Sequence, residues 1–126
     1  MMPTATKLSI LVAEDESLLR MMATDMFEEA GFKVVEASSG EAAVDLLKTA
    51  PVSALFTDVE LLGKMDGLEL AWIAYERDPD AAILVVSGRR LPQRDDLPPG
   101  AIFLSKPYDL KRVLQSLEQM IVEQKA

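Results

Sequence analysis

In the stretch "SALFTDVELLG", residues 53–63, a mostly apolar run is followed directly by the acidic residue Asp58. The residues before Asp58 suit a buried strand, and more apolar residues follow it. A carboxylate at the end of a buried strand costs free energy unless another group compensates for it. We therefore expect Asp58 to have a chemical role, and we expect its partners at the ends of similar runs.

Four other apolar runs alternate with segments of helical spacing: "LSILVA" (8–13), "KVVEA" (33–37), "AAILVVS" (81–87) and "AIFLS" (101–105). Most are continuous, which is typical of strands covered on both faces, whereas "KVVEA" is the most polar and is expected at an edge. Alternation of strand and helix predicts a parallel sheet between two helix layers. We expect one α/β domain over residues 1–126, with a core from about 7 to 122.

Polar residues mark where the helices should begin. Ser17 is expected to cap the first helix, and Ser38 with Glu41 fits a capping box ahead of the second. Asp66 is expected to cap the third. The interval "GRRLPQRDDLPPG" (88–100) carries three prolines and two glycines. The fourth helix, which the topology requires there, should therefore be short or irregular.

Composition argues against several classes of function. The 126 residues include no Cys and no His, which removes disulfides, thiolate metal sites and the commonest general base. A net charge of −8 at pH 7 argues against binding to nucleic acid or to an anionic membrane. The start "MMPTATKLSI" lacks the pattern of a signal peptide, and no apolar run approaches the roughly 20 residues of a membrane span. A cytoplasmic protein is expected.

Charged and polar side chains follow four of the runs. Ligands of parallel α/β sheets bind beyond the carboxyl ends of the strands, so these side chains should meet at one edge. Each alone has an ordinary explanation, such as a turn or a helix start, but together they favour a joint site. They are Glu14, Asp15, Asp58, Ser87 and Lys106.

The charges of this set do not balance. Two carboxylates about 5 Å apart repel by roughly 3 kcal/mol at an effective dielectric constant of about 20. Three carboxylates against one ammonium leave an excess of two negative charges, which a divalent cation would cancel. Because only oxygen ligands are present, we expect Mg²⁺. With Mg²⁺ and Lys106 neutralising an incoming phosphoryl group, Asp58 would attack it as a nucleophile.

The same residues, in this order, resemble the receiver domain of two-component response regulators. "DGLELA" (66–71) and "FLSKPYDL" (103–110) are also typical of that family, and the resemblance covers residues from about 7 to 122. It implies a flavodoxin-like, doubly wound sheet of five parallel strands in the order 2-1-3-4-5. It also implies a signalling protein without an output domain, which would act through an unknown downstream protein.

The resemblance implies a role for each residue. Asp58 would accept a phosphoryl group from a histidine of a sensor kinase or of a phosphotransfer protein. Lys106 would contact the phosphoryl oxygens, and Ser87 would move toward the phosphate after transfer. The ligands of Mg²⁺ would be Glu14, Asp15, Asp58 and the backbone carbonyl of Glu60.

Two further expectations come from the resemblance alone. Phe103 falls where the family has an aromatic switch residue, although an aromatic side chain in an apolar strand also suits a core. The Lys106–Pro107 peptide bond is a candidate for the cis form.

The loop after Asp58 departs from the family pattern. Leu61 and Leu62 stand where the family usually has Met-Pro, and loss of the fixed φ of Pro predicts a more mobile loop. Gly63 and Lys64 make the loop one residue longer than the usual form.

Two charged residues flank the expected phosphate position. Glu60, two residues after Asp58, would repel the phosphoryl group or alter an attacking water. Arg89, two residues after Ser87, would offset that charge by pairing with Glu60. Both are therefore candidate modulators of the reaction.

Two alternatives stay open. The first is a degenerate receiver that is never phosphorylated and serves as a binding module. The second is a small phosphatase of the haloacid-dehalogenase type, since Asp58-Val59-Glu60 is similar to its acid pair. In those enzymes the nucleophile follows the first strand, whereas Asp58 follows the third run, and 126 residues leave no cap to select a substrate.

Overall fold

The five predicted strands form one parallel sheet in the order β2-β1-β3-β4-β5, so the predicted class and topology are confirmed. The computed structural model describes residues 8–89 and 92–125; residue 7, where the predicted core begins, lies outside them. The strands are β1 (Ser9–Ala13), β2 (Lys33–Ala37), β3 (Ala54–Asp58), β4 (Ala82–Ser87) and β5 (Ile102–Ser105). The helices are α1 (Ser17–Glu29), α2 (Gly40–Thr49), α3 (Gly67–Arg77) and α4 (Leu110–Lys125).

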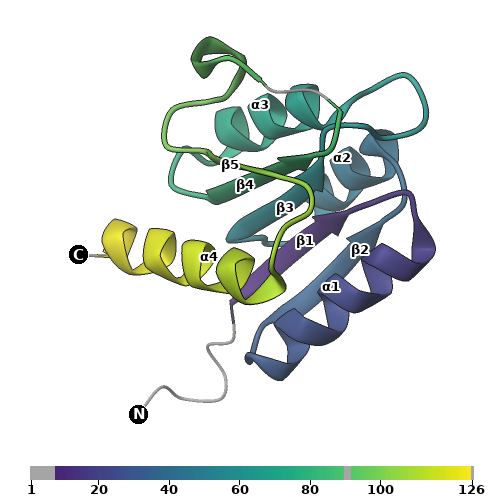
Figure 1. The fold of residues 1–126 in the computed structure, drawn as a ribbon. Coiled ribbons are helices and arrows are strands. Elements are labelled where there is room, and N and C mark those ends of the chain that lie inside the picture. Colours follow the sequence, from purple (N-terminus) through teal and green to yellow (C-terminus); the bar gives the residue numbers. More distant parts are fainter. Residues whose placement is uncertain (1–7, 90–91, 126) are drawn as a thin grey trace.

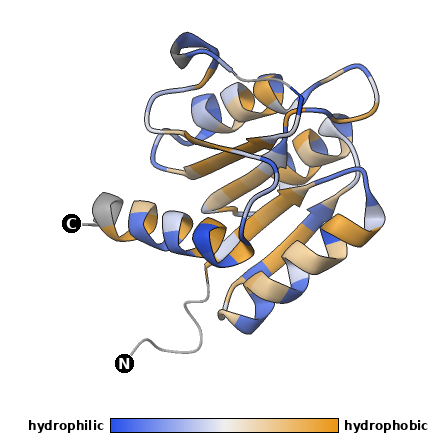
Figure 2. Cartoon of the chain, in the orientation of Figure 1, coloured by the Kyte–Doolittle hydropathy of each residue, from blue (hydrophilic) through white to orange (hydrophobic). Residues whose placement is uncertain are grey.

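Helices cover both faces of the sheet (Figure 1). α2 and α3 pack on the face that carries Leu11 and Leu55, while α1 and α4 pack on the face that carries Ile10 and Phe56. Successive residues of a strand point to opposite faces, so each strand contributes to both cores. Figure 2 shows the resulting apolar centre, and the more polar β2 lies at an edge as predicted. Within the described chain, no helix has the length and apolar character needed to cross a membrane.

The starts of α1 and α2 differ from the prediction. α1 has Glu16 at its N-cap position without a side-chain cap bond, so Ser17 does not cap the helix but is its first residue. α2 is capped by Ser39, whose hydroxyl accepts the N–H of the residue three positions later at 3.1 Å. The prediction of a box from Ser38 and Glu41 is wrong because two adjacent serines offer the same chemistry, and the sequence alone does not choose between them.

α3 begins directly against the end of β3. Asp66 caps it as predicted: its carboxylate accepts the Glu69 N–H at 2.9 Å, and the Glu69 side chain accepts the Asp66 N–H at 3.4 Å. The Gly67 N–H donates to the carbonyl of Val59 at 2.8 Å. A Cβ on Gly67 would lie 1.9 Å from the carbonyl oxygen of Asp58. Only glycine allows the helix and the strand to approach this closely.

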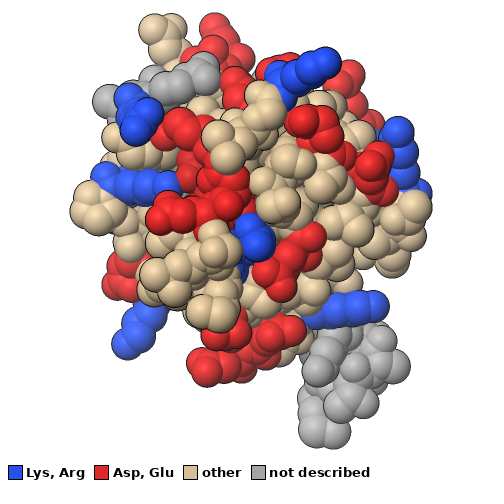
Figure 3. All heavy atoms as spheres, turned by 90° about the vertical axis from the view of Figure 1, so that its right-hand side faces the viewer, with Lys and Arg blue, Asp and Glu red and all other residues tan. Residues whose placement is uncertain are grey.

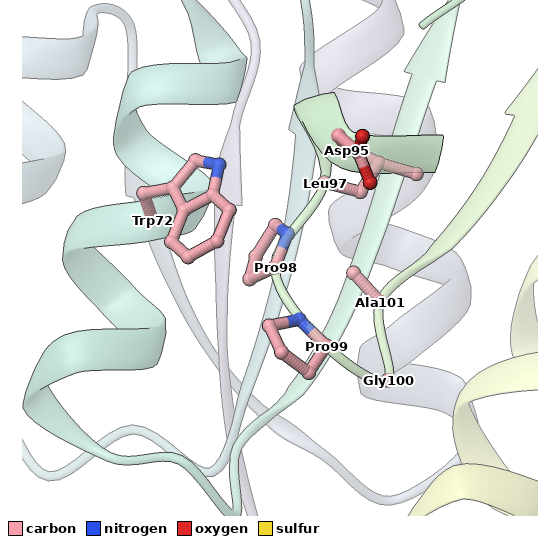
Figure 4. Close-up of a pocket in the computed structure, with 7 residues that line it drawn as sticks. All are labelled: Trp72, Asp95, Leu97, Pro98, Pro99, Gly100 and Ala101. Carbon is pink, nitrogen blue, oxygen red and sulfur yellow. The ribbon is translucent and has the colours of Figure 1, made fainter. Parts of the chain in front are cut away.

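The β4–β5 connection, residues 88–101, has only a 3₁₀ turn, η2 (Arg94–Asp96), as helical structure among its described residues. The sequence predicted that the helix between the fourth and fifth strands would be short or irregular, and this is confirmed. This connection is distinct from α4, which follows β5. Residues 90–91 of the interval lie outside the described residues. The Trp72 indole N–H donates to the carbonyl of Asp96 at 3.0 Å. Figure 4 shows the Trp72 ring facing Pro98 and Pro99 beside a cavity of about 480 Å³. Trp72 therefore anchors the β4–β5 connection to α3.

Replacing Trp72 by Phe should loosen the β4–β5 connection and leave the sheet intact. Phe keeps an aromatic ring but has no N–H for the Asp96 carbonyl, so the free energy of unfolding should fall by about 0.5–1.5 kcal/mol. Urea unfolding measures this loss. Amide hydrogen exchange should accelerate over residues 92–101 and stay unchanged in β1 and β3; unchanged exchange over 92–101 would contradict the proposed role of Trp72.

Candidate functional site

The site is centred on a buried ion pair at the carboxyl edge of the sheet. The Lys106 ammonium lies 2.5 Å from Oδ2 of Asp58, although 48 residues separate the two in sequence. Asp58 is only 4% exposed, because β3 is buried along its whole length. Its other oxygen, Oδ1, accepts the N–H of Glu60 at 3.0 Å. Both oxygens of this carboxylate are therefore held in place.

The pKa of Lys106 shows how strongly the carboxylates act on it. Burial alone lowers the pKa, but the hydrogen bond and attraction of Asp58, together with the attraction of Glu14, raise it by more. The net shift is upward, so Lys106 stays protonated at neutral pH.

Figure 3 shows the face of the molecule toward which the arrow of β1 points in Figure 1. This face carries many acidic side chains around a few basic ones.

Glu14 lies at the end of β1 and is 6% exposed. Its Oε2 has no hydrogen-bond partner among the described residues. Burial, followed by repulsion from Asp58, raises the pKa of Glu14 from 4.5 to about 7, even though Lys106 opposes the shift. Negative charge is therefore in excess at this point, as the count of charges in the sequence predicts.

Neighbouring backbone groups fix the segment that carries the acids. Oδ2 of Asp15 accepts the N–H of Leu62 at 3.0 Å, which ties β1 to the loop that follows β3. Nη1 of Arg20 donates to the carbonyl of Glu14 at 2.8 Å, and Nε of Arg20 lies 3.3 Å from Glu36. Sequence reasoning missed all three contacts: two involve a backbone group, which no side-chain motif marks, and the Arg20–Glu36 ion pair joins side chains 16 residues apart.

Ser87, at the end of β4, is 1% exposed and contacts Glu60. Its hydroxyl oxygen lies 2.8 and 2.7 Å from the two carboxylate oxygens of Glu60. The backbone N–H of Arg89 also donates to Glu60, at 3.3 Å. The sequence predicted that Glu60 flanks the site and pairs with Arg89; the contact observed with Arg89 is through its backbone, and the bond to Ser87 was not foreseen.

The oxygen donors suit a hard divalent cation. Glu14, Asp15 and Asp58 converge from β1 and β3, and Oε2 of Glu14 has no competing hydrogen-bond donor among the described residues. The side chains do not yet form a cage, since residues 8–89 and 92–125 contain no group of three acidic side chains arranged to hold a metal ion. The Leu62 N–H lies on Asp15 and the Lys106 ammonium lies on Asp58, and the role of the Glu60 carbonyl stays a prediction.

The remaining predicted residues lie on β5 and just after it. Phe103 is half-buried and packs against the core formed with α2 and α3, so its switch role stays a prediction. The Lys106–Pro107 peptide bond is cis, as the resemblance implies. Tyr108, which the sequence did not single out, has a raised pKa, chiefly through burial, with Glu14 and Asp58 adding to the shift and Lys106 opposing it.

An apolar groove of about 820 Å³ opens beside the ion pair, between α1 and residues 106–111. Lys106 lines the groove, so the groove leads to the site. Met21 and Leu18 of α1 are also exposed large apolar side chains. The groove's principal apolar lining residues are Leu19, Met22, Met26, Pro107 and Leu110.

Comparison with known proteins identifies the arrangement. The family model described as "Response regulator receiver domain" matches residues 10–118. The response regulator receiver protein CpdR of Brucella abortus (strain 2308) is 36% identical over 116 residues, covering 90% of this chain and 96% of CpdR. The crystal structure of a response regulator receiver protein from Sinorhizobium medicae WSM419 has a TM-score of 0.90 at 30% identity, covering 95% of this chain and 98% of that one. The receiver domain from the hybrid histidine kinase CckA has a TM-score of 0.75 at 29% identity, covering 90% and 98%.

Replacing Glu14 by Gln should stabilise the metal-free protein above neutral pH. Below about pH 4.5 the carboxyl group is protonated in both the folded and the unfolded chain, so the two proteins should differ little. As the pH rises toward 7, the unfolded chain loses this proton first and folding becomes less favourable. Above pH 8 the variant should gain about 2–3 kcal/mol in free energy of unfolding.

Urea unfolding between pH 4 and 8.5 in the presence of a chelator measures this difference. Glu118→Gln removes one charge from an exposed position of α4 and serves as the control. A gain that does not vary with pH, or that Glu118→Gln reproduces, would contradict the role assigned to Glu14.

Proposed function

Because this chain belongs to the response regulator receiver domain family of two-component signalling, we propose that it accepts a phosphoryl group on Asp58 and thereby changes a protein-binding surface. The observation that carries this proposal is the Lys106–Asp58 pair at the end of a buried strand. A buried carboxylate held against an ammonium, with two further acids beside it, suits a nucleophile that must receive an anionic group.

The transfer would form one bond as another breaks. A carboxylate oxygen of Asp58 attacks the phosphorus of a phosphohistidine on the partner protein, and the P–N bond breaks as the new P–O bond forms. The bonding electron pair goes to the imidazole nitrogen of the partner. Lys106 would move from the carboxylate toward the phosphoryl oxygens and balance their charge. Glu14, Asp15 and Asp58 would hold Mg²⁺, which adds positive charge at those oxygens when it is bound.

Ser87 and Phe103 would convert the new charge into a change of surface. The Ser87 hydroxyl donates to Glu60 and would have to leave that carboxylate before it contacts the phosphoryl group. Phe103 would then repack on β5 beside it. Phosphorylation switches surfaces in this way when the added charge finds new hydrogen-bond donors.

The groove beside Lys106 would receive the phosphodonor, a sensor histidine kinase or a phosphotransfer protein. Its apolar lining on α1 suits the apolar face of a partner helix. Residues 1–126 would act as a single receiver domain whose output is contact with a downstream protein. The acidic surface does not favour nucleic acid as that target.

Incubation with a small phosphodonor and Mg²⁺ should add one phosphoryl group per chain. Intact-mass measurement should detect it in the wild-type protein and not in Asp58→Asn, which lacks the nucleophilic oxygen. Chelation of Mg²⁺ should slow the gain at least ten-fold, since the phosphoryl charge would lose its counter-ion.

Other outcomes of that experiment support the alternatives. No mass gain in a folded wild-type protein would contradict the proposal and favour an interaction module that is never phosphorylated. Repeated hydrolysis of a small phosphoester, with many turnovers per chain, would favour a phosphatase.

Glu60→Gln should increase the rate of phosphorylation by the small donor about three- to ten-fold. The substitution keeps the size of the side chain and an acceptor for Ser87 but removes a negative charge that repels the incoming phosphoryl group. A time course of mass gain measures the rate, and Glu76→Gln, on an exposed position of α3, controls for the loss of one charge. Equal rates in wild type and Glu60→Gln would show that Glu60 does not modulate the reaction.

A further inference from the structure

Residue 62 serves the site through its backbone rather than its side chain. The Leu62 side chain is 71% exposed and therefore adds little to the core. Its N–H points the other way and donates to Oδ2 of Asp15 at 3.0 Å, across 47 residues of sequence. What this position supplies to the site is one hydrogen-bond donor.

The neighbours of Leu62 hold that donor in place. Leu61 is 9% exposed and packs in the core shared with α2 and α3, which anchors the chain on one side. Gly63 has a φ of +105°, a conformation that reverses the chain and that other residues rarely adopt. Gly67 then packs on the backbone of Asp58. The β3–α3 loop, residues 59–66, is thus fixed at both ends with the Leu62 N–H turned toward Asp15.

The same loop also donates to Asp58. The Glu60 N–H contacts Oδ1 of Asp58, and Lys106 contacts Oδ2. Of the three acids, Glu14 keeps an unpartnered buried oxygen among the described residues. An N–H donor takes up a lone pair and part of the negative charge of the oxygen that accepts it, so it opposes a cation on that same oxygen. Among the described residues the acids do not form a group arranged to hold a metal ion.

We propose that the Leu62 N–H competes with the divalent cation for Asp15, so that residue 62 sets the Mg²⁺ affinity of the site. This inference rests on the proposed function, which assigns Mg²⁺ to these acids. Oδ2 of Asp15 must release the Leu62 N–H before this oxygen can turn fully to a cation. The β3–α3 loop therefore has one arrangement without the cation and another with it.

Two substitutions separate the backbone donor from the side chain. Leu62→Pro removes the N–H, because proline has no amide hydrogen. Leu62→Ala removes most of the exposed side chain and keeps the N–H, so it is the matched control. Calorimetric titration with MgCl₂ should show binding about three- to ten-fold tighter for Leu62→Pro than for wild type, as expected for the loss of one competing hydrogen bond. Leu62→Ala should bind like wild type.

The outcomes distinguish this inference from the proposed function. Equal Mg²⁺ affinity in all three proteins would overturn the role of Leu62 while leaving the phosphoacceptor proposal intact. Tighter binding by Leu62→Ala as well would assign the effect to the side chain and would also overturn it. No Mg²⁺ binding by any of the proteins would overturn both the inference and the metal site of the proposed function.

A second measurement uses the wild-type protein and does not depend on the folding of Leu62→Pro. Solvent-exchange NMR should show the Leu62 amide exchanging faster as MgCl₂ is added, following the same titration curve as calorimetry. The N–H of Ala42, bonded to Ser39 at the start of α2, should be unaffected. An exchange rate of the Leu62 amide that stays constant through saturation with MgCl₂ would overturn the proposal.

Discussion

The ion pair between Asp58 and Lys106 is the contact on which the rest of the site depends. β3 delivers one carboxylate to a buried position, where a nearby positive charge and a backbone N–H offset the loss of its contacts with water. Lys106 supplies that charge from beyond β5 and stays protonated because Asp58 attracts it. Oε2 of Glu14 has no hydrogen-bond partner among the described residues. The raised pKa of Glu14 shows that a negative charge is unfavourable at this position. The site therefore has too much negative charge until a cation or another compensating group arrives.

Much of this arrangement could be predicted from the sequence, since it follows from periodicity and strand ends. The apolar runs predicted the five strands, and the more polar "KVVEA" predicted one edge of the sheet. The strand order, with β5 at the other edge, followed from the resemblance to the receiver family. Prolines in residues 88–100 predicted the absence of a regular helix. The convergence of Asp58 and Lys106 followed from parallel topology, because the carboxyl ends of parallel strands share one edge.

The contacts that the sequence did not reveal mostly involve backbone groups or a choice between equivalent side chains. Ser38 and Ser39 have the same capping chemistry, and only the path of the chain selects Ser39. Every residue except proline has a backbone N–H, so the sequence does not show that the N–H of Leu62 will bond to Asp15. Glu60 was expected beside the site, but its bond to Ser87 depends on side-chain conformations that local sequence does not determine.

The close approach at Gly67 limits how this chain can diverge. The smallest replacement, alanine, would add a methyl group 1.9 Å from the carbonyl oxygen of Asp58. Exposed positions of the loop tolerate side chains of other sizes and polarities, but position 67 accepts no residue other than glycine. A new loop grafted onto the scaffold can therefore differ at the exposed position 64, but it must keep glycine at position 67.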